Sequence, residues 1–252
     1  INMDLIYGLP WQSVHTMRRT LETVLTWRPE RIALYSYAHL PDRFKAQRRI
    51  DTTAVPDASE KLAMLKLAVT TLLEAGYVYV GMDHFARPDD ELSQAMDEGT
   101  LQRNFQGYST RADCDLIALG VSAISRIGPV YAQNAKTLEE YHAALAKGEL
   151  PLIRGLVMDR DDEIRRDAIH GLLCQSSLSF DDLSQRWAID AKRYFEEDLD
   201  SLTELQLEGL VDVDEDQVRI TPKGRFMSRV VAMKFDKYLR KGQTMARYSK
   251  VI

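Results

Sequence analysis

The sequence predicts an α/β protein, with a parallel sheet in residues 1–150 and a mostly helical part in residues 151–252. Two observations predict this arrangement. Short apolar runs alternate with segments of helical periodicity near the start of the chain, and this order brings consecutive strands together in parallel. Beyond Pro151 helical periodicity dominates. We therefore expect two domains, 1–150 and 151–252, which suits a chain of 252 residues.

Alternating strands and helices are predicted in the first part. They are a strand at 2–8, a helix at 13–28, a strand at 31–37, a helix at 57–75 and a strand at 77–80. Pro29 stops the first helix because proline cannot continue one, and Gly76 ends the second. The residues expected on the buried faces are Val14, Met17, Leu21, Val24 and Leu25 in the first helix and Leu62, Leu65, Leu67, Leu72 and Leu73 in the second.

Helices open the second part. We expect them at 159–174, 180–187 and 190–207, with Gly209 closing the last. Apolar runs at 211–213 and 217–220 flank an acidic turn and predict a hairpin. With a last helix at 222–239, this order resembles a winged-helix module.

The composition, 45% hydrophobic and 28% charged, predicts a soluble protein. No apolar run approaches the roughly 18 residues that cross a bilayer. We also find no charged-then-apolar leader, and therefore expect a cytoplasmic protein with no membrane partner. The chain opens on INMDLI at 1–6, which is typical of the middle of a buried strand, so we expect it to be a fragment.

Two cysteines, Cys114 and Cys174, are present. Their number and separation exclude a disulfide framework and a closely spaced cysteine metal site within this chain. We expect both to be small buried hydrophobic residues.

The run 81–88, GMDHFARP, follows the predicted strand at 77–80. Its glycine, aromatic, histidine and arginine residues are not typical of a core, and predict a loop that closely approaches a flat, anionic ligand. His84 has three interpretations: a metal ligand, an acid or base, or a neutral imidazole hydrogen-bonded within a loop. Arg87 is either solvated or paired with a carboxylate, which arginine binds bidentately.

Further candidate residues lie in loops after strands. NFQGY at 104–108 sets Phe105 beside Gln106, and GVSAIS at 120–125 is a small-residue turn. Phe105 is a candidate ligand contact or an aromatic plug. The basic group Arg43, Lys45, Arg48 and Arg49 binds carboxylates or forms a solvated face. Asp4 stands in an apolar strand, where an unpaired buried carboxylate would be costly and would indicate function.

The runs 81–88, 104–108 and 120–125 together resemble the oxygen-independent coproporphyrinogen III oxidases, radical S-adenosylmethionine enzymes of haem biosynthesis. The resemblance extends from Ile1 to Ile252. It implies the C-terminal part of a partial (β/α) radical-S-adenosylmethionine barrel, followed by a winged-helix-like domain. It also implies two molecules of S-adenosyl-L-methionine and a [4Fe–4S] cluster held by a CxxxCxxC loop. No such loop occurs in this sequence, so the resemblance places the cluster cysteines upstream of Ile1.

The same resemblance implies roles for individual residues. It assigns cofactor binding to Asp4, Ala38 and Ile124, with Asp4 contacting the second S-adenosyl-L-methionine. It assigns a catalytic position beside the cofactor to Phe105, Gln106 and Ile124. It places His84, Arg87 and Arg48 as substrate-binding residues.

The implied reaction converts two propionates of coproporphyrinogen III to vinyl groups, giving protoporphyrinogen IX without oxygen. A 5′-deoxyadenosyl radical abstracts a hydrogen from the propionate β-carbon, and loss of carbon dioxide and one electron leaves the vinyl group. The implied partners are the porphyrinogen and a reductase, ferredoxin or flavodoxin as electron donor. We expect a monomer, and an inactive fragment because it lacks the cluster loop.

Three alternatives stay open. A haem-chaperone-like relative would share the barrel but should lack the runs 81–88 and 104–108. A radical S-adenosylmethionine enzyme could act on another substrate. A winged-helix regulator would use the basic segment 223–252, which has nine Lys or Arg residues. Because the whole chain carries a formal charge of −5 and the expected wing is acidic, we expect no nucleic-acid partner.

Overall fold

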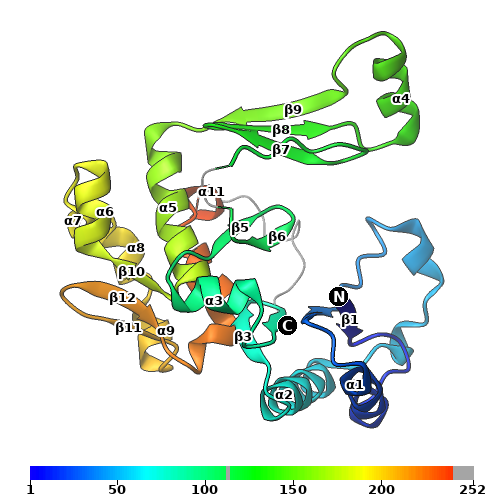
Figure 1. Cartoon of the computed structure of the whole chain (residues 1–252). Helices are drawn as coiled ribbons and strands as arrows, with labels where there is room; N and C mark the ends of the chain where they lie inside the picture. Colours follow the sequence, from blue (N-terminus) through cyan, green and yellow to red (C-terminus); the bar gives the residue numbers. More distant parts are fainter. Residues whose placement is uncertain (112–113, 241–252) are drawn as a thin grey trace.

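The computed structural model describes residues 1–111 and 114–240. Figure 1 shows a four-stranded sheet with two helices near the bottom, a three-stranded sheet at the top and a helical part at the left. An α/β part thus precedes a mostly helical part, and the predicted fold class is confirmed. The predicted basic segment spans residues 223–252, and its part from 241 to 252 lies outside the described residues. No helix in the described ranges is long and apolar enough to cross a membrane.

The first sheet has the strand order β1-β2-β4-β3. Its strands are β1 (Asn2–Tyr7), β2 (Arg31–Ser36), β3 (Val78–Gly81) and β4 (His84–Ala86). β1 and β2 are parallel, as predicted, but the expectation of a parallel sheet throughout is wrong because β4 lies antiparallel between β2 and β3. Met82 and Asp83 connect β3 to β4, and positive φ angles at Gly81 and Met82 help the chain to reverse there.

The hairpin of β3 and β4 also corrects the prediction of a ligand-binding loop at 81–88. Phe85 is only 2% exposed and packs in the core between the sheet and its helices. This run therefore contributes a strand to the core, and His84 is held on that strand rather than on a free loop.

Two helices cover one face of the first sheet. α1 (Val14–Trp27) and α2 (Ala58–Glu74) begin at the N-caps Ser13 and Asp57, close to the predicted ends. In α1 the predicted buried face is present. In α2 the prediction was wrong for Leu62 and Leu73, which are exposed because the helix packs along Met64, Ala68 and Leu72. Two short 3₁₀ helices, η1 (Lys45–Arg49) and η2 (Thr52–Ala54), lie between β2 and α2.

Three elements follow β4 that the periodicity did not reveal. They are α3 (Glu91–Asp97) and the hairpin of β5 (Gln102–Asn104) and β6 (Gly107–Ser109). A separate antiparallel sheet then contains β7 (Ile124–Ile127), β8 (Val130–Asn134) and β9 (Leu152–Val157), with α4 (Leu138–Ala146) between the last two strands. β9 pairs with β8, so it lies with the elements before residue 150; the two-domain division stays a prediction.

The helical part is built around α5 (Arg160–Cys174), whose N-cap Asp159 lies at the predicted start of the helix. It continues with β10 (Ser177–Ser179) and α6 (Phe180–Trp187). The single helix expected at 190–207 was wrong: the chain forms α7 (Ala191–Tyr194), α8 (Glu196–Asp200) and α9 (Thr203–Leu207). These breaks let Ala191, Phe195, Leu202 and Leu205 all reach one core.

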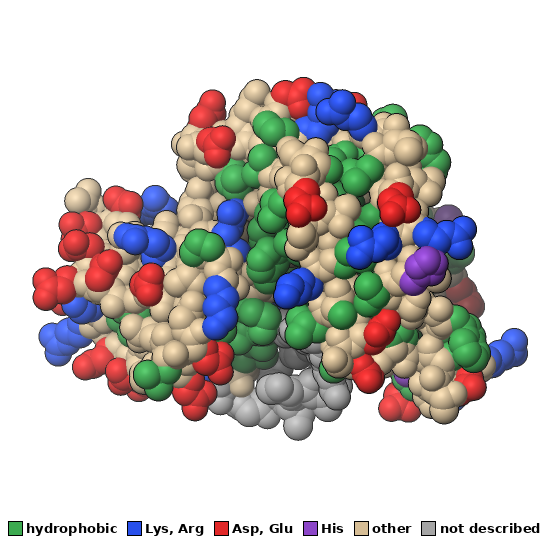
Figure 2. All heavy atoms as spheres, turned by 90° about the horizontal axis from the view of Figure 1, so that it is seen from below, with side chains coloured by type: hydrophobic (Ala, Val, Ile, Leu, Met, Phe, Trp, Pro, Cys, Tyr) green, Lys and Arg blue, Asp and Glu red, His purple; other side chains and the backbone are tan. Residues whose placement is uncertain are grey.

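The predicted hairpin is present as β11 (Val211–Val213) and β12 (Gln217–Ile220), and β10 adds a third strand. The last predicted helix is divided into η3 (Gly224–Met227), α10 (Ser228–Met233) and α11 (Lys237–Arg240). Seen from below, apolar side chains line a furrow between α2 and η3, and acidic side chains gather over the helical part at the left (Figure 2).

The β5–β6 hairpin is fixed to the first sheet by a glycine. Gly81 is buried, and a Cβ there would lie 2.4 Å from the Tyr108 hydroxyl. That hydroxyl donates a hydrogen bond to the Leu173 carbonyl at 3.1 Å, so sheet, hairpin and α5 meet at one point. The position therefore requires glycine for space as well as for its positive φ.

We expect Gly81→Ala to lower the free energy of unfolding by about 2–4 kcal/mol, because the new methyl group must displace Tyr108. Gly99→Ala is the matched control: Gly99 also has a positive φ but open space around its Cβ position, and should cost about 1 kcal/mol. Urea unfolding measures both. Equal losses would show that Tyr108 moves aside without cost.

Candidate functional site

Asp4, Ala33 and His84 form a row across three neighbouring strands. Asp4 pairs with Ala33 on β2, and Ala33 pairs with His84 on β4. Side chains alternate along a strand, and Ile32 and Leu34 belong to the core under α1 and α2, so this row points away from the helices. The structure thus brings two of the predicted site residues onto one face of the sheet.

Asp4 is exposed on this face, and the expectation that it is buried was wrong. Its carboxylate accepts a hydrogen bond from the Asn2 side-chain amide at 2.8 Å. The negative charge of Asp4 raises the pKa of both Tyr35 and His84. Asp4 can therefore meet a ligand without the desolvation cost that a buried carboxylate carries.

His84 is a neutral imidazole held between two aromatic rings. Its ring lies edge-on to Tyr108 at 5.3 Å and to Tyr35 at 6.1 Å. Burial lowers its pKa, the nearby Arg103 lowers it further, and Asp4 opposes both. Its buried Nδ1 has no hydrogen-bond partner within 1–111 and 114–240. The group can donate or accept a hydrogen bond but is poorly suited to carry a charge.

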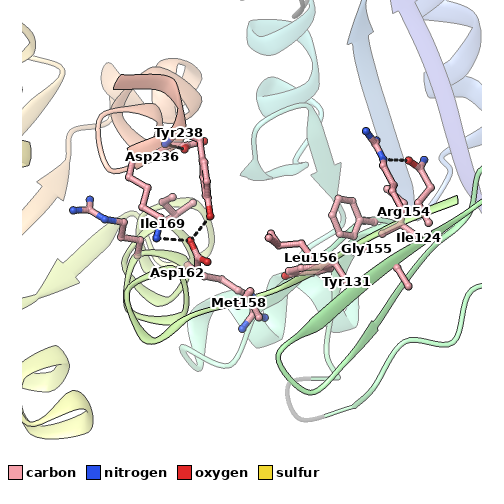
Figure 3. Close-up of a pocket in the computed structure, with 16 residues that line it drawn as sticks. Ile124, Tyr131, Arg154, Gly155, Leu156, Met158, Asp162, Ile169, Asp236 and Tyr238 are labelled. Carbon is pink, nitrogen blue, oxygen red and sulfur yellow. Dashed lines mark hydrogen bonds and ion pairs between the residues drawn. The ribbon is translucent and has the colours of Figure 1, made fainter. Parts of the chain in front are cut away.

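Phe105 and Ile124 line one hollow, shown in Figure 3. Phe105 occupies the two-residue turn of the β5–β6 hairpin and lies edge-on to Tyr131 of β8 at 5.3 Å. Ile124 begins β7 and pairs with Gln133. Gln106 is exposed at the same turn, where its backbone N–H donates to the Asn104 side chain at 2.8 Å. Phe105 and Ile124, which are nineteen positions apart in the sequence, therefore line the same hollow.

The hollow has a volume of about 750 Å³ and lies between the β7–β9 sheet, α5 and α11. Its wall on the sheet is mainly apolar, with Arg154 donating to Gln133 at 2.7 Å. At the other end Asp162 accepts from Lys237 at 2.8 Å and from Tyr238 at 2.9 Å (Figure 3). Such an apolar cavity with a few fixed polar groups suits a flat organic ligand.

Ala38 and Arg48 lie on the segment that follows β2. The Ala38 carbonyl accepts from the Gln47 side chain at 3.0 Å, and exposed Arg48 donates to the Pro41 carbonyl at 3.0 Å. Neither is among the described residues that line the hollow. Ala38 follows the carboxyl end of β2, on the sheet that carries Asp4 and His84.

Arg87 lies at the opposite edge of the sheet. β4 runs antiparallel to β2, so the residue after it reaches the amino end of β2, where its N–H donates to the Glu30 carbonyl. Its guanidinium is bidentate to Asp89, at 3.0 and 2.9 Å. The structure therefore does not bring Arg87 together with Ala38 or the hollow.

Sequence reasoning missed a group of three arginines and one histidine beside the hollow. Arg103 is on β5, Arg126 on β7, and Arg166 and His170 on α5. The Nε2 atom of His170 accepts from the Arg103 backbone N–H at 3.1 Å. Burial lowers the pKa of His170 to about 4, and nearby Arg166 lowers it in the same direction. The i, i+4 spacing of Arg166 and His170 was the signal that could have placed them on one helix face.

The cysteines differ in their surroundings. Cys174 is buried as expected, and burial raises its pKa to about 12. Cys114 is exposed, so the expectation was wrong for this residue. Over the described part of the chain, no group of three or more His, Cys, Asp or Glu residues could hold a metal ion.

The chain is similar to known proteins along its whole length. The HemN C-terminal domain family matches residues 158–227. The chain is 47% identical over 251 residues to the oxygen-independent coproporphyrinogen III oxidase of Salmonella typhimurium, covering 100% of this chain and 55% of that protein. It is 40% identical over 250 residues to the enzyme of the same name from Thermostichus vulcanus, covering 98% of this chain and 77% of that protein.

A solved structure gives the same result. It is described as "Coproporphyrinogen III oxidase (HemN) from Escherichia coli is a Radical SAM enzyme" and matches with a TM-score of 0.91 at 47% identity, covering 94% of this chain and 55% of that one. The chain thus spans about half the length of that enzyme and of the Salmonella relative.

We expect His84 to titrate below the ordinary histidine range in an NMR pH titration. Arg103→Met should raise its pKa because a repelling cation is removed, and Asp4→Asn should lower it because an attracting anion is removed. The ring signals of His15, on the exposed side of α1, are the control and should behave alike in all three proteins.

The lowered pKa of His84 should make the stability of the fold depend on pH. The unfolded chain binds a proton to His84 more readily, so the contribution of this residue to stability should be lost as pH falls below about 6.5. A fall in the pKa of His84 in Arg103→Met, or a rise in Asp4→Asn, would contradict the proposed electrostatic neighbours.

Proposed function

The chain belongs to the oxygen-independent coproporphyrinogen III oxidase family, and on this basis we propose that the whole protein converts coproporphyrinogen III to protoporphyrinogen IX without oxygen. Two propionates would lose carbon dioxide and become vinyl groups. The observation that carries the proposal is the meeting of Phe105 and Ile124 in one large hollow, beside cations suited to carboxylates. An electron donor such as a reductase, ferredoxin or flavodoxin belongs to the same proposal.

S-adenosyl-L-methionine fits the residues present. The apolar wall containing Phe105 and Ile124 suits the adenosine, and the exposed carboxylate of Asp4 can accept hydrogen bonds from a polar ligand. When bound, this cofactor supplies radical chemistry. We propose that Asp4, Ala38 and Ile124 hold it, with Gln106 at the adjacent hairpin turn.

The [4Fe–4S] cluster does not fit the residues of this chain. There are two cysteines in the sequence, and the described ranges contain no metal-binding group of three or more suitable residues. We therefore propose that residues outside this chain hold the cluster, and we assign none of its chemistry to the residues described.

The residues of this chain would position the substrate and exclude water. The apolar hollow keeps water from the reacting carbon, and neutral His84 can donate a hydrogen bond to a propionate without adding charge. Arg87 is bonded to Asp89 at the opposite edge of the sheet and has no part in this proposal, whereas exposed Arg48, on the segment that carries Ala38, is kept as a candidate substrate-binding residue.

In the whole protein, Phe105→Ala should reduce kcat at least about tenfold, because the aromatic wall beside the cofactor is lost. The measurement is anaerobic conversion of coproporphyrinogen III with S-adenosyl-L-methionine and a reductant. Trp27→Ala is the control, since Trp27 is also an exposed aromatic but ends α1 on the opposite side of the sheet. An undiminished kcat in the Phe105 variant would remove this residue from the site.

Anaerobic iron–sulfur reconstitution of the 252-residue chain should give no stoichiometric [4Fe–4S] absorbance, because its two cysteines cannot form a three-cysteine site. The whole protein, treated in parallel, should take up one cluster. A well-formed cluster in the 252-residue chain would contradict the assignment of its ligands to other residues.

A further inference from the structure

The three arginines and the histidine that sequence reasoning missed surround a small cavity between β5, β7 and α5. The cavity has a volume of about 180 Å³ and is lined by Arg103, Arg126, Arg166 and His170, together with Phe105. Arg103 and Arg126 come from two different hairpins, and Arg166 comes from the helix. Their convergence is therefore a product of the tertiary structure.

Arg103, Arg126 and Arg166 lack carboxylate partners. None of them has an ion pair within the described ranges, and the Nε atoms of Arg103 and Arg126 are buried without a hydrogen-bond acceptor there. A buried guanidinium donor without an acceptor is costly. Arg103 gains only the face of the Tyr108 ring, with its Cζ 5.8 Å from the ring centre. The arrangement is therefore complete only with an anion.

The carboxylate that follows Arg166 in the sequence, Asp167, is already engaged. Asp167 accepts from Arg186 at 2.7 Å and from the Trp187 indole at 2.8 Å, on the side of α5 toward α6. His170 cannot supply a compensating negative charge. Its Nε2 atom accepts from the Arg103 backbone N–H, which requires the unprotonated nitrogen, so it shapes the cavity as a neutral group. The positive charge of the three arginines thus faces the cavity.

The small cavity adjoins the large hollow. Phe105, Tyr131, Arg166 and Ile169 line both. A volume of about 180 Å³ lies below the range of roughly 300–1,000 Å³ typical of cavities that hold a whole organic ligand. The hollow of about 750 Å³ lies within that range. The pair of spaces therefore suits a large ring that extends a short anionic arm past Phe105.

We propose that Arg103, Arg126 and Arg166 form a carboxylate subsite that binds one propionate arm of a tetrapyrrole whose ring occupies the adjacent hollow. This inference rests on the proposed function, because it names the groups that hold that substrate. Arginine is suited to the task since its planar donors bind a carboxylate bidentately. The subsite fixes the position of the ring relative to Phe105 and Ile124.

The test measures binding of coproporphyrin III, the stable oxidised form of the substrate, to the whole protein by porphyrin fluorescence under anaerobic conditions. Arg103→Gln, Arg126→Gln and Arg166→Gln should each weaken binding about tenfold, as expected for loss of a charge-assisted hydrogen bond. Binding of the tetramethyl ester, which has no carboxylates, should be unchanged in these variants. Arg19→Gln, on the exposed side of α1, is the control and should bind both ligands as the unaltered protein does.

Arg166→Lys guards against misfolding, because it keeps the charge on α5 and should lose less affinity than Arg166→Gln. If the ester and coproporphyrin III are weakened equally, or if no variant weakens coproporphyrin III, the subsite is wrong. Inorganic phosphate is a second probe of the arginines, and variants that lose phosphate binding but keep unchanged porphyrin binding would also overturn the subsite. An unaltered whole protein that fails to convert coproporphyrinogen III would instead contradict the proposed function, whatever the binding results.

Discussion

α5 must pack against two different parts of the molecule at once, and the positions of the other elements depend on this constraint. Ile164, Ala168 and Leu172 face the core of the helical part. The opposite side presents Arg166 and His170 to the β5–β6 hairpin, where His170 accepts the Arg103 backbone N–H. In Figure 1 the helix stands between the helical part and the hairpin. A shift of α5 would therefore disturb the core and the candidate site together.

Two adjacent arginines on this helix illustrate how a charge serves structure or function. Arg165 is half-enclosed by Asp161 and Asp198, at 3.0 and 2.9 Å, and also donates to the Phe235 carbonyl at 3.1 Å. Its charge is balanced within the fold. Arg166, one residue later, has no such acid in the described residues and faces a cavity. Because an unbalanced charge is costly in a partly buried place, such a residue indicates a missing anion.

The site also shows which work falls to the protein and which to a cofactor. The described residues include an apolar wall, a neutral histidine and convergent cations, but no group that could hold a metal. Such groups position a ligand, exclude water and balance charge. They do not by themselves break a carbon–hydrogen bond. This division is consistent with the solved relative from Escherichia coli, which is named a radical SAM enzyme, because in cofactor enzymes the difficult chemistry belongs to the cofactor.

The sequence by itself determined the family and the starts of three main helices. Ser13, Asp57 and Asp159 mark helix starts because their side chains cap backbone N–H groups. The motif residues Phe105 and Ile124 were recognisable from the residues next to them in the sequence. Tertiary structure decided the rest. The sequence pattern did not predict β4, which joins the sheet because Gly81 and Met82 allow the chain to reverse direction. Arg87 consequently lies away from His84. The arginines converge only because pairing and packing bring distant segments together, which no local pattern encodes.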